Sequence, residues 1–313
     1  MKSFIVVLLG ATAVGKTALS ILLAKALHAE IISCDSMLLY QGFDIGTAKP
    51  TVDERQGIPH HLLDCLEPGA SFNAANFCRL SQEKMREISS RGNLPLLVGG
   101  TGLYMKSFLE GYAFNTTKEN ASYRKYLESI ALEKGNSHLH QLLQTVDLKT
   151  AERLHKNDTR RIIRALEVAR ENEQISQEKA STLPIYPSFV IGITRPRKEI
   201  YDRIHKRIDQ MLSDGLLEEI RRLLASGVPA DTQAMQAIGY KELIPYLFGD
   251  VSLEDAVQEL KKNTRHFAKR QITWFRKMPY IHWYEASQDQ DVLLRKIIWD
   301  IKHCKESEAF HLA

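Results

Sequence analysis

The chain has 313 residues, of which 44% are hydrophobic and 26% are charged, as in ordinary soluble globular proteins. This composition excludes a chain that is disordered over most of its length, and the net charge of +4 permits a polyanionic partner without requiring one. No apolar run reaches the roughly eighteen residues that a membrane helix needs, so we expect a soluble, untargeted protein of the cytoplasm.

The first predicted element is a strand over residues 4–9, a continuous apolar run that ends at Gly10. Such a run is typical of a strand buried on both faces, as in a parallel sheet. Residues 18–26 then carry apolar side chains at helical spacing. Strands that alternate with helices predict an α/β fold with a parallel sheet. Further short strands are predicted at residues 31–33, 94–98 and 189–193.

The sequence pattern changes between about residues 116 and 187. No strand is predicted there, and apolar residues recur every three or four positions, the spacing of one helix face. We interpret residues 116–187 as an all-helical insertion domain that contacts the partner macromolecule. The α/β core then comprises residues 1–115 and 188–313, including C-terminal helices. These helices are predicted at residues 200–224, 234–247 and 253–275.

Residues 10–17 read GATAVGKT and match the motif G-x-x-x-x-G-K-[ST] of a phosphate-binding loop. The loop joins a predicted strand to a predicted helix, so its backbone N–H groups and the helix N-terminus would face phosphate oxygens. Lys16 supplies a positive charge, and the Thr17 hydroxyl can ligate Mg²⁺. The motif predicts a phosphate or diphosphate site with Mg²⁺ as cofactor and does not specify ATP. The predicted diphosphate-binding residues of the loop are Gly10, Ala11, Thr12, Ala13, Val14, Gly15, Lys16 and Thr17.

Asp35 follows the second predicted strand. Because the carboxyl ends of parallel strands gather around the ligand, Asp35 is expected to face the phosphate loop. A carboxylate there can hold Mg²⁺ through water or accept a proton from a nucleophile. Asp is also a good helix N-cap, and position alone leaves both interpretations open.

Six segments together resemble the tRNA dimethylallyltransferase (isopentenyltransferase) family. They follow the family's order and span about residues 3–285. The resemblance implies a P-loop NTPase-like parallel sheet flanked by helices. The segments are GATAVGKT at residues 10–17, DSMLLYQGFDIGTAKP at 35–50, PHHLLD at 59–64, LVGGTGLY at 97–104, NDTRRIIRALEV at 157–168 and AKRQITWFR at 268–276.

The family moves a dimethylallyl group from its diphosphate to the exocyclic amine of the adenosine just 3′ of the anticodon, in tRNAs that read codons beginning with U. The resemblance implies dimethylallyl diphosphate as donor and the tRNA anticodon stem-loop as partner. We expect the protein to be a monomer. It implies that Asp35 is the general base and Thr101 a polar contact in the reaction channel, beside the catalytic cation Lys16. The tRNA contacts that it implies are Asp35, Ser36, Met37, Leu38, Thr101, Arg160, Arg161, Ile162, Ile163, Arg164, Gln236, Gly239, Tyr240 and Lys241.

The sequence departs from the family's commonest motifs at three positions. Ala11 and Val14 replace the Pro and Ser of the usual phosphate loop, where the backbone does the binding. Leu38 stands where many members carry Gln, and a leucine side chain cannot form a hydrogen bond to the target base.

Basic residues lie at helical spacing in three places. Arg160 and Arg164 share one face of a helix that Asp158 is expected to cap, and Arg265 and Lys269 share another, with Arg276 beyond. We predict that these faces contact the tRNA backbone, and a solvated surface is the alternative. The third place is Arg203 and Arg207, which can support the diphosphate or pair with Asp202 or Asp209.

Two other functions fit part of the sequence. A small-molecule kinase that uses ATP explains the phosphate loop and Asp35 but gives no reason for the basic helices. A nucleotide-switch protein that binds RNA without turnover is the third candidate.

Metal–thiolate chemistry is not expected. No CxxC pair occurs, and the adjacent His60 and His61 point in different directions, so we expect reduced cysteines and no histidine-bound metal. The four cysteines are Cys34, Cys65, Cys78 and Cys304.

Overall fold

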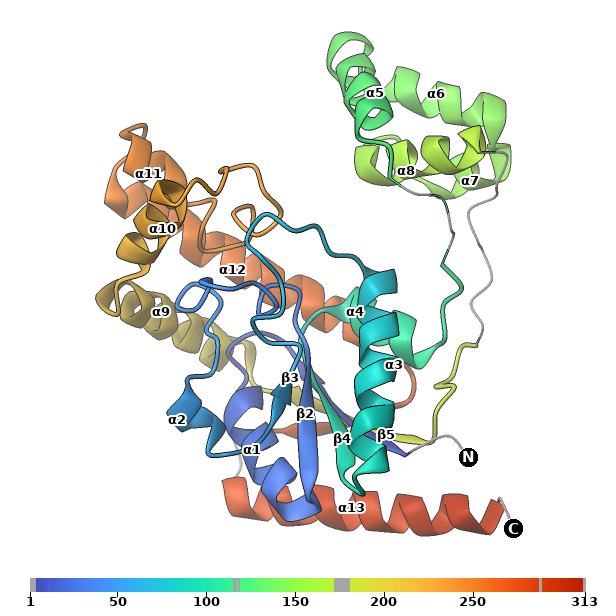
Figure 1. Cartoon of the computed structure of the whole chain (residues 1–313), viewed down its shortest axis with the longest axis vertical. Helices are drawn as coiled ribbons and strands as arrows, with labels where there is room; N and C mark the ends of the chain where they lie inside the picture. The colour runs from blue at the N-terminus through green and yellow to red at the C-terminus, as the bar shows by residue number, and fades with distance from the viewer. Residues whose placement is uncertain (1–3, 115–116, 118, 172–180, 287–288, 312–313) are drawn as a thin grey trace. The chain divides into compact units, whose positions relative to one another are not determined.

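The computed structural model describes residues 4–114, 117, 119–171, 181–286 and 289–311 (Figure 1). The chain divides into two compact units. Unit 1 comprises Met1–Glu110 and Ser181–Ala313, and unit 2 comprises Gly111–Ala180. None of the helices in the described residues is both long and apolar enough to cross a membrane.

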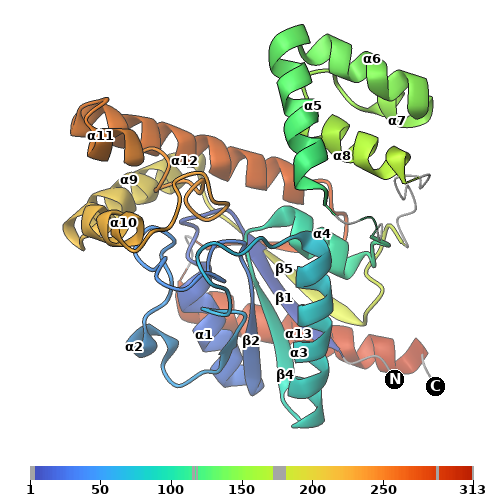
Figure 2. The ribbon, with the colours of Figure 1, turned by 45° about the horizontal axis from the view of Figure 1, so that its top comes forward.

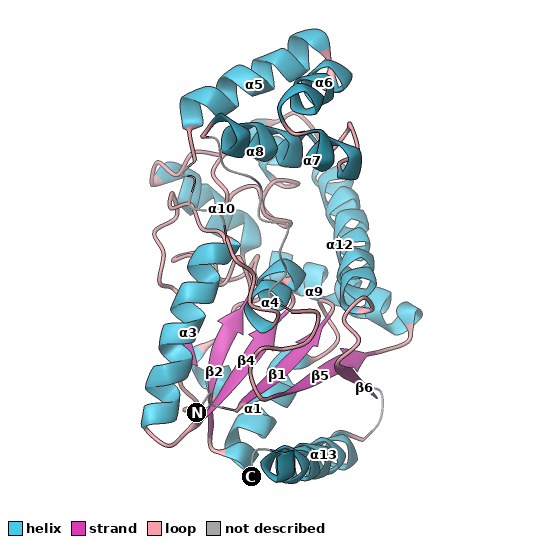
Figure 3. Ribbon diagram, turned by 90° about the vertical axis from the view of Figure 1, so that its right-hand side faces the viewer, coloured by secondary structure: helices cyan, strands magenta, loops and turns pink. Residues whose placement is uncertain are grey.

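Within the described residues, unit 1 contains one six-stranded sheet in the order β3-β2-β4-β1-β5-β6, and all neighbouring strands are parallel (Figure 3). Every residue of the central strand β1 is buried, as its continuous apolar run predicts. The α/β fold class and the four predicted strands are confirmed. The strands are β1 (Ile5–Gly10), β2 (Ala29–Cys34), β3 (His60–His61), β4 (Leu94–Gly99), β5 (Ser188–Thr194) and β6 (Ile281–Glu285).

Helices flank the sheet. α1 and α13 pack against each other and against the sheet, and α3 packs against the sheet and against α4. α9, α10 and α11 gather around α12 (Figure 2). The helices of unit 1 are α1 (Lys16–Leu27), α2 (Val52–Arg55), α3 (Ala74–Ser90), α4 (Gly102–Leu109), α9 (Arg197–Ser213), α10 (Leu216–Ala225), α11 (Ile244–Phe248), α12 (Leu253–Phe275) and α13 (Gln290–His311).

The C-terminal helices differ in part from the prediction. α12 has the predicted bounds, and the Ser252 hydroxyl caps its N-terminus. The predicted helix over residues 200–224 is two helices, because Gly215 adopts a left-handed conformation (φ +98°) between them. The predicted helix over residues 234–247 is wrong: turns fill it up to α11, and Gly239 has φ +108°.

The parallel sheet brings four strand ends to one edge. β1, β2, β4 and β5 end at Gly10, Cys34, Gly99 and Thr194, and Gly10 pairs with Ile193 of β5. The residues that follow these ends are therefore neighbours, although up to about 180 residues separate them in the sequence.

The described residues of unit 2 form helices joined by loops and have their own apolar core, which includes Leu139, Leu143 and Ile162. The buried Glu167 carboxylate accepts two hydrogen bonds from Arg124, at 2.9 and 2.8 Å, and so ties α8 to α5. The helices are α5 (Ala121–Lys134), α6 (Asn136–Val146), α7 (Leu148–Arg153) and α8 (Thr159–Arg170).

Candidate active site

The phosphate loop lies between β1 and α1. Gly15 adopts φ +103° at the start of α1, a conformation that favours glycine. The Lys16 ammonium donates hydrogen bonds to the carbonyl oxygens of Gly10 and Ala11, at 2.9 and 2.8 Å. A Cβ atom on Gly10 would lie 2.8 Å from the Ile193 carbonyl oxygen, so glycine is required for close packing against β5.

Burial lowers the pKa of Lys16 to about 8. The Asp35 carboxylate raises that pKa and the Arg207 guanidinium lowers it. The Lys16 ammonium therefore lies within electrostatic range of both a carboxylate and a second cation. Binding of a polyanion here would relieve the repulsion between these cations.

Arg203 and Arg207 extend from α9 toward this loop. Arg203 donates from Nε to the Ala13 carbonyl oxygen at 2.7 Å. Burial lowers the pKa of Arg207, and nearby Arg203 lowers it further. In the described part of the chain neither arginine pairs with Asp202 or Asp209, and Asp209 instead pairs with Lys261 at 2.6 Å. This geometry favours the diphosphate interpretation of the two arginines over the salt-bridge alternative.

Arg195, which follows β5, also lies at the phosphate loop and was not predicted as a site residue. Its Nε donates to the Val14 carbonyl oxygen at 2.8 Å, and its guanidinium pairs with Glu199. The signal that singled out Asp35, a polar residue directly after a buried strand, also applies to Arg195. Three arginine side chains thus surround the phosphate loop, and two of them hold its backbone carbonyl groups.

Asp35 and Thr101 follow the neighbouring strands β2 and β4. Asp35 Oδ1 accepts the Met37 N–H at 2.9 Å, and Thr101 Oγ1 accepts the Ser36 N–H at 3.0 Å. The Thr101 N–H donates to the Cys34 carbonyl oxygen at 3.2 Å. No helix begins at Asp35, because residues 36–39 form bends and turns, so the helix-cap alternative is wrong. The carboxylate closes a local turn at the sheet edge beside Lys16.

The segment after Asp35 is held in place by two buried charged groups. Lys49 donates to the Tyr40 carbonyl oxygen at 2.8 Å and pairs with Asp44 and Asp64. Glu219 of α10 accepts the N–H groups of residues 44–46, at 2.8–3.1 Å.

Tyr240 does not face solvent as a tRNA-binding side chain would. It is fully buried, and its hydroxyl donates to Glu219 at 2.7 Å. Its ring fills the space that a Cβ on Gly46 would occupy, with only 2.5 Å between them. The Tyr240 side chain therefore belongs to the core, and the tRNA contact implied for Tyr240 stays a prediction.

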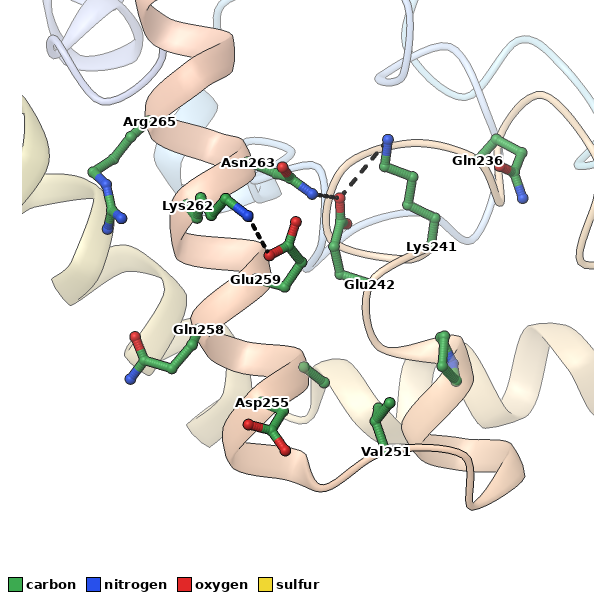
Figure 4. Close-up of a pocket in the computed structure, with 12 residues that line it drawn as sticks. Gln236, Lys241, Glu242, Val251, Asp255, Gln258, Glu259, Lys262, Asn263 and Arg265 are labelled. Carbon is green, nitrogen blue, oxygen red and sulfur yellow. Dashed lines mark hydrogen bonds and ion pairs between the residues drawn. The ribbon is translucent and has the colours of Figure 1, made fainter.

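The neighbours of Tyr240 line a pocket of about 830 Å³ (Figure 4). Lys241 and Asn263 point toward the Glu242 carboxylate, at 3.8 and 3.0 Å. Gln236 is exposed and donates to the Ala230 carbonyl oxygen, and the buried Gly239 donates its N–H to Glu242. Of this predicted stretch, the side chains of Gln236 and Lys241 are accessible.

The basic residues of α12 have different surroundings. Arg265 donates to His205 at 2.7 Å and lies over the Tyr201 ring. Lys269 is exposed and lines, with Trp274 and others, a second pocket of about 480 Å³. Lys269 is therefore available to an external anion, whereas Arg265 is already bound within the chain.

In unit 2 some of the predicted tRNA contacts are exposed, and others are buried or bound within the chain. Arg160 and Arg161 are exposed, whereas Ile162 and Ile163 are buried in the core of the unit. Arg164 donates to Glu167 and to the Thr117 carbonyl oxygen, at 3.3 and 2.8 Å. The two isoleucine side chains therefore belong to the core of unit 2, and the tRNA contact implied for residues 160–164 stays a prediction.

A sequence model of the family described as "IPP transferase" matches residues 38–278. The tRNA dimethylallyltransferase of Bacillus pumilus is 47% identical over 289 residues, which cover 91% of this chain and 91% of that protein. The tRNA dimethylallyltransferase of Bacillus subtilis is 45% identical over 300 residues, which cover 94% and 95%. The chain belongs to the tRNA dimethylallyltransferase family.

Solved structures agree with this membership. The tRNA isopentenylpyrophosphate transferase of Bacillus halodurans is 40% identical, with a TM-score of 0.77 over the whole of both chains. A eukaryotic dimethylallyltransferase acting on tRNA is 28% identical, with a TM-score of 0.75 over 91% of this chain and 74% of that one. Membership of the tRNA dimethylallyltransferase family disfavours the kinase alternative.

Other candidate residues of this family member have structural roles. His61 Nε2 lies 2.6 Å from Glu30 Oε2, and His60 Nδ1 lies 2.8 Å from the Ile58 carbonyl oxygen. Among the described residues no group of three His, Cys, Asp or Glu side chains could hold a metal ion. No disulfide joins the four cysteines, all of which the structure describes.

Proposed function

We propose that this chain transfers a dimethylallyl group from dimethylallyl diphosphate to the exocyclic amine of the adenosine 3′ of the anticodon, in tRNAs that read codons beginning with U. One observation carries the proposal. In a member of this family, the phosphate loop with Lys16 and Arg203 meets the turn of Asp35 and Thr101 at one sheet edge. This neighbourhood supports a proposed diphosphate site beside a proposed proton acceptor.

The loop stabilises the leaving group. As the bond from the allylic carbon to oxygen breaks, charge develops on the diphosphate, where Lys16 and the arginines lie. The allylic carbon shares positive charge, so the weakly nucleophilic adenosine amine suffices when it is held in line and close. The new carbon–nitrogen bond forms as the old carbon–oxygen bond breaks, and the amine proton passes to Asp35.

Mg²⁺ fits this site. The Thr17 side chain is exposed at the first turn of α1, next to Lys16, and its hydroxyl forms no hydrogen bond within the described residues. An oxygen ligand beside a diphosphate site is the type of environment that Mg²⁺ prefers. The bound ion would neutralise diphosphate charge, with Thr17 as protein ligand.

The test is an incubation of the protein with labelled dimethylallyl diphosphate and unmodified tRNA. We expect label in tRNA and free diphosphate, a requirement for Mg²⁺, and no requirement for ATP. Phosphoryl transfer from ATP without labelled tRNA would favour the kinase, and RNA binding without turnover would favour the switch protein.

The pH dependence of donor use is expected to report Lys16. Its ammonium form is present below the pKa of about 8 and is lost as the pH rises through that value. We therefore expect kcat/KM for dimethylallyl diphosphate to fall about tenfold per pH unit above this range, since kcat/KM reports the free enzyme. In Lys16→Arg the charge persists, so this alkaline limb should vanish from the profile measured between pH 6 and 10. An identical limb in both proteins would assign it to another group.

The exposed basic residues are expected to bind the tRNA backbone. Arg160→Ala and Lys269→Ala should each lower tRNA affinity. Each should also reduce the magnitude of the slope of log association constant against log salt concentration by about 0.7–0.9, because a complex with one phosphate contact fewer releases fewer counterions when it forms. Arg164→Ala and Arg265→Ala should change the slope less, since both side chains are bound within the chain.

Arg79→Ala is the matched control. Arg79 is exposed but pairs with Glu83 on α3. If wild type, Arg160→Ala and Lys269→Ala show the same salt-dependence slope, the helix faces that carry Arg160 and Lys269 are only solvated surface.

A further inference from the structure

Gln271 connects two parts of the active site from the buried face of α12. Its Oε1 accepts the N–H of Thr12 in the phosphate loop at 2.8 Å. Its Nε2 donates to the carbonyl oxygen of Gly100, directly after β4, at 2.9 Å. The side chain is only 6% exposed. One amide group thus joins segments that lie 259 and 171 residues away in the sequence.

The hydrogen bond to Gly100 connects Gln271 to the turn that carries Asp35, the proposed proton acceptor. Gly100 precedes Thr101, whose hydroxyl accepts the Ser36 N–H and whose N–H donates to Cys34. These bonds fix the turn that carries Asp35. The Thr12 end belongs to the loop that holds the diphosphate. Gln271 therefore lies between the donor half and the acceptor half of the site.

The packing around this amide leaves little freedom. A Cβ on Gly100 would lie 2.5 Å from Gln271 Nε2 and 3.5 Å from the Gly10 carbonyl oxygen. One turn further along α12, Trp274 packs so closely on Gly102 that a Cβ there would lie 2.4 Å from the ring. The register of α12 against the turn after β4 is therefore fixed.

The opposite face of the same helix is cationic. Lys269 and Arg270 of α12 are exposed and line the pocket of about 480 Å³, together with Lys277 in the turn after the helix. α12 thus carries Lys269, which is proposed to contact RNA, on one face and the Gln271 amide that holds the phosphate loop on another.

We propose that Gln271 is a positioning residue for the transfer reaction, which sets the spacing between the diphosphate loop and the Asp35–Thr101 turn. This inference rests on the proposed function. The reacting carbon and nitrogen must approach to about 3–3.5 Å in line, and a misplacement of about 1 Å can lower the rate a hundredfold. Gln271 contacts neither reacting group and acts through the Thr12 and Gly100 backbones.

The first test is Gln271→Leu, which preserves most of the volume and removes both hydrogen bonds. We expect kcat at saturating substrates to fall about ten- to a hundredfold, with the donor KM and the tRNA Kd changed by less than about threefold. This split between kcat and binding distinguishes positioning from a general loss of folded protein. Activity is measured well below the melting temperature of each variant. A wild-type kcat would overturn the inference.

The second test is Gln271→Glu, which remains informative if the leucine variant folds poorly. An ionised carboxylate at this position can accept the Thr12 N–H but cannot donate to Gly100, whereas the protonated carboxyl can do both. Burial raises the pKa of such a carboxyl, so the protonated form becomes populated as the pH falls. We expect kcat relative to wild type to recover as the pH falls from 8 to about 5.5. For Gln271→Leu the same ratio should stay constant.

Gln82→Leu and Gln82→Glu are the matched controls. Gln82 is a half-buried residue of α3 that donates to the Tyr186 hydroxyl at 3.0 Å, outside the proposed site. Both variants should retain wild-type kcat at every pH. A flat pH ratio for Gln271→Glu would overturn the inference while leaving an active wild type in place. A wild-type enzyme that transfers no dimethylallyl group to tRNA would overturn the proposed function itself.

Discussion

Replacing Asp35 by asparagine is expected to lower kcat for dimethylallyl transfer by about a hundredfold or more, the usual effect of losing a general base. Asparagine Oδ1 can still accept the Met37 N–H, so the turn that Asp35 closes should persist. The Asp35→Asn variant thus removes the group that accepts the amine proton but keeps the conformation of the turn. Single-turnover measurements with the enzyme saturated by both substrates report the chemical step.

The same variant should also change the behaviour of Lys16. The Asp35 carboxylate raises the pKa of the Lys16 ammonium, so its removal should shift the alkaline limb of donor kcat/KM below pH 8. Asp53→Asn, an exposed change on α2, serves as the control and should alter neither quantity. Near wild-type turnover in Asp35→Asn would restrict Asp35 to closing the turn.

Replacing Glu219 by alanine is expected to destabilise unit 1 by roughly 2–4 kcal/mol, because it leaves partly buried donors without acceptors. Those donors are the N–H groups of residues 44–46 and the Tyr240 hydroxyl. A stability loss of this size corresponds to several degrees in Tm, which circular dichroism measures.

Two further variants separate the contributions. Tyr240→Phe removes the phenol hydroxyl alone and should lower stability by about 1 kcal/mol. Glu218→Ala changes the adjacent carboxylate, which is 69% exposed and pairs with Arg221 on the surface, and should leave Tm almost unchanged. Equal effects of Glu218→Ala and Glu219→Ala would contradict a specific role for the buried carboxylate.

Local sequence patterns predicted the parts of this protein whose structure is decided locally. The apolar run of β1, the glycines of the phosphate loop and the helical period of α12 all act over a few residues. β3 and β6 were not predicted. β3 has only two residues, and β6 contains exposed His282 and Trp283 between its buried residues Ile281 and Tyr284, which breaks the alternation of a strand.

Long-range contacts account for what the sequence could not predict. The resemblance gave Tyr240 only as a tRNA contact, and its burial depends on the hydrogen bond from its hydroxyl to the distant Glu219. Ile162 and Ile163 lie beside exposed arginines in the sequence and on the opposite, buried face of α8 in the structure. Gln271 lies within the family segment at residues 268–276, but its role could not be read from that segment because both of its partners lie more than 170 residues away.

The order of the strands along the chain has a consequence for synthesis on the ribosome. β1 is made first and can pair with β4 once about a hundred residues have emerged, but its other neighbour, β5, begins only at Ser188. The helices of unit 2 lie between, and their local contacts allow them to form in that interval. Until β5 arrives, the most apolar strand of the nascent chain exposes one unpaired edge, the feature that promotes aggregation. Slow translation through residues 111–180 would therefore prolong the period in which the growing chain needs chaperone protection.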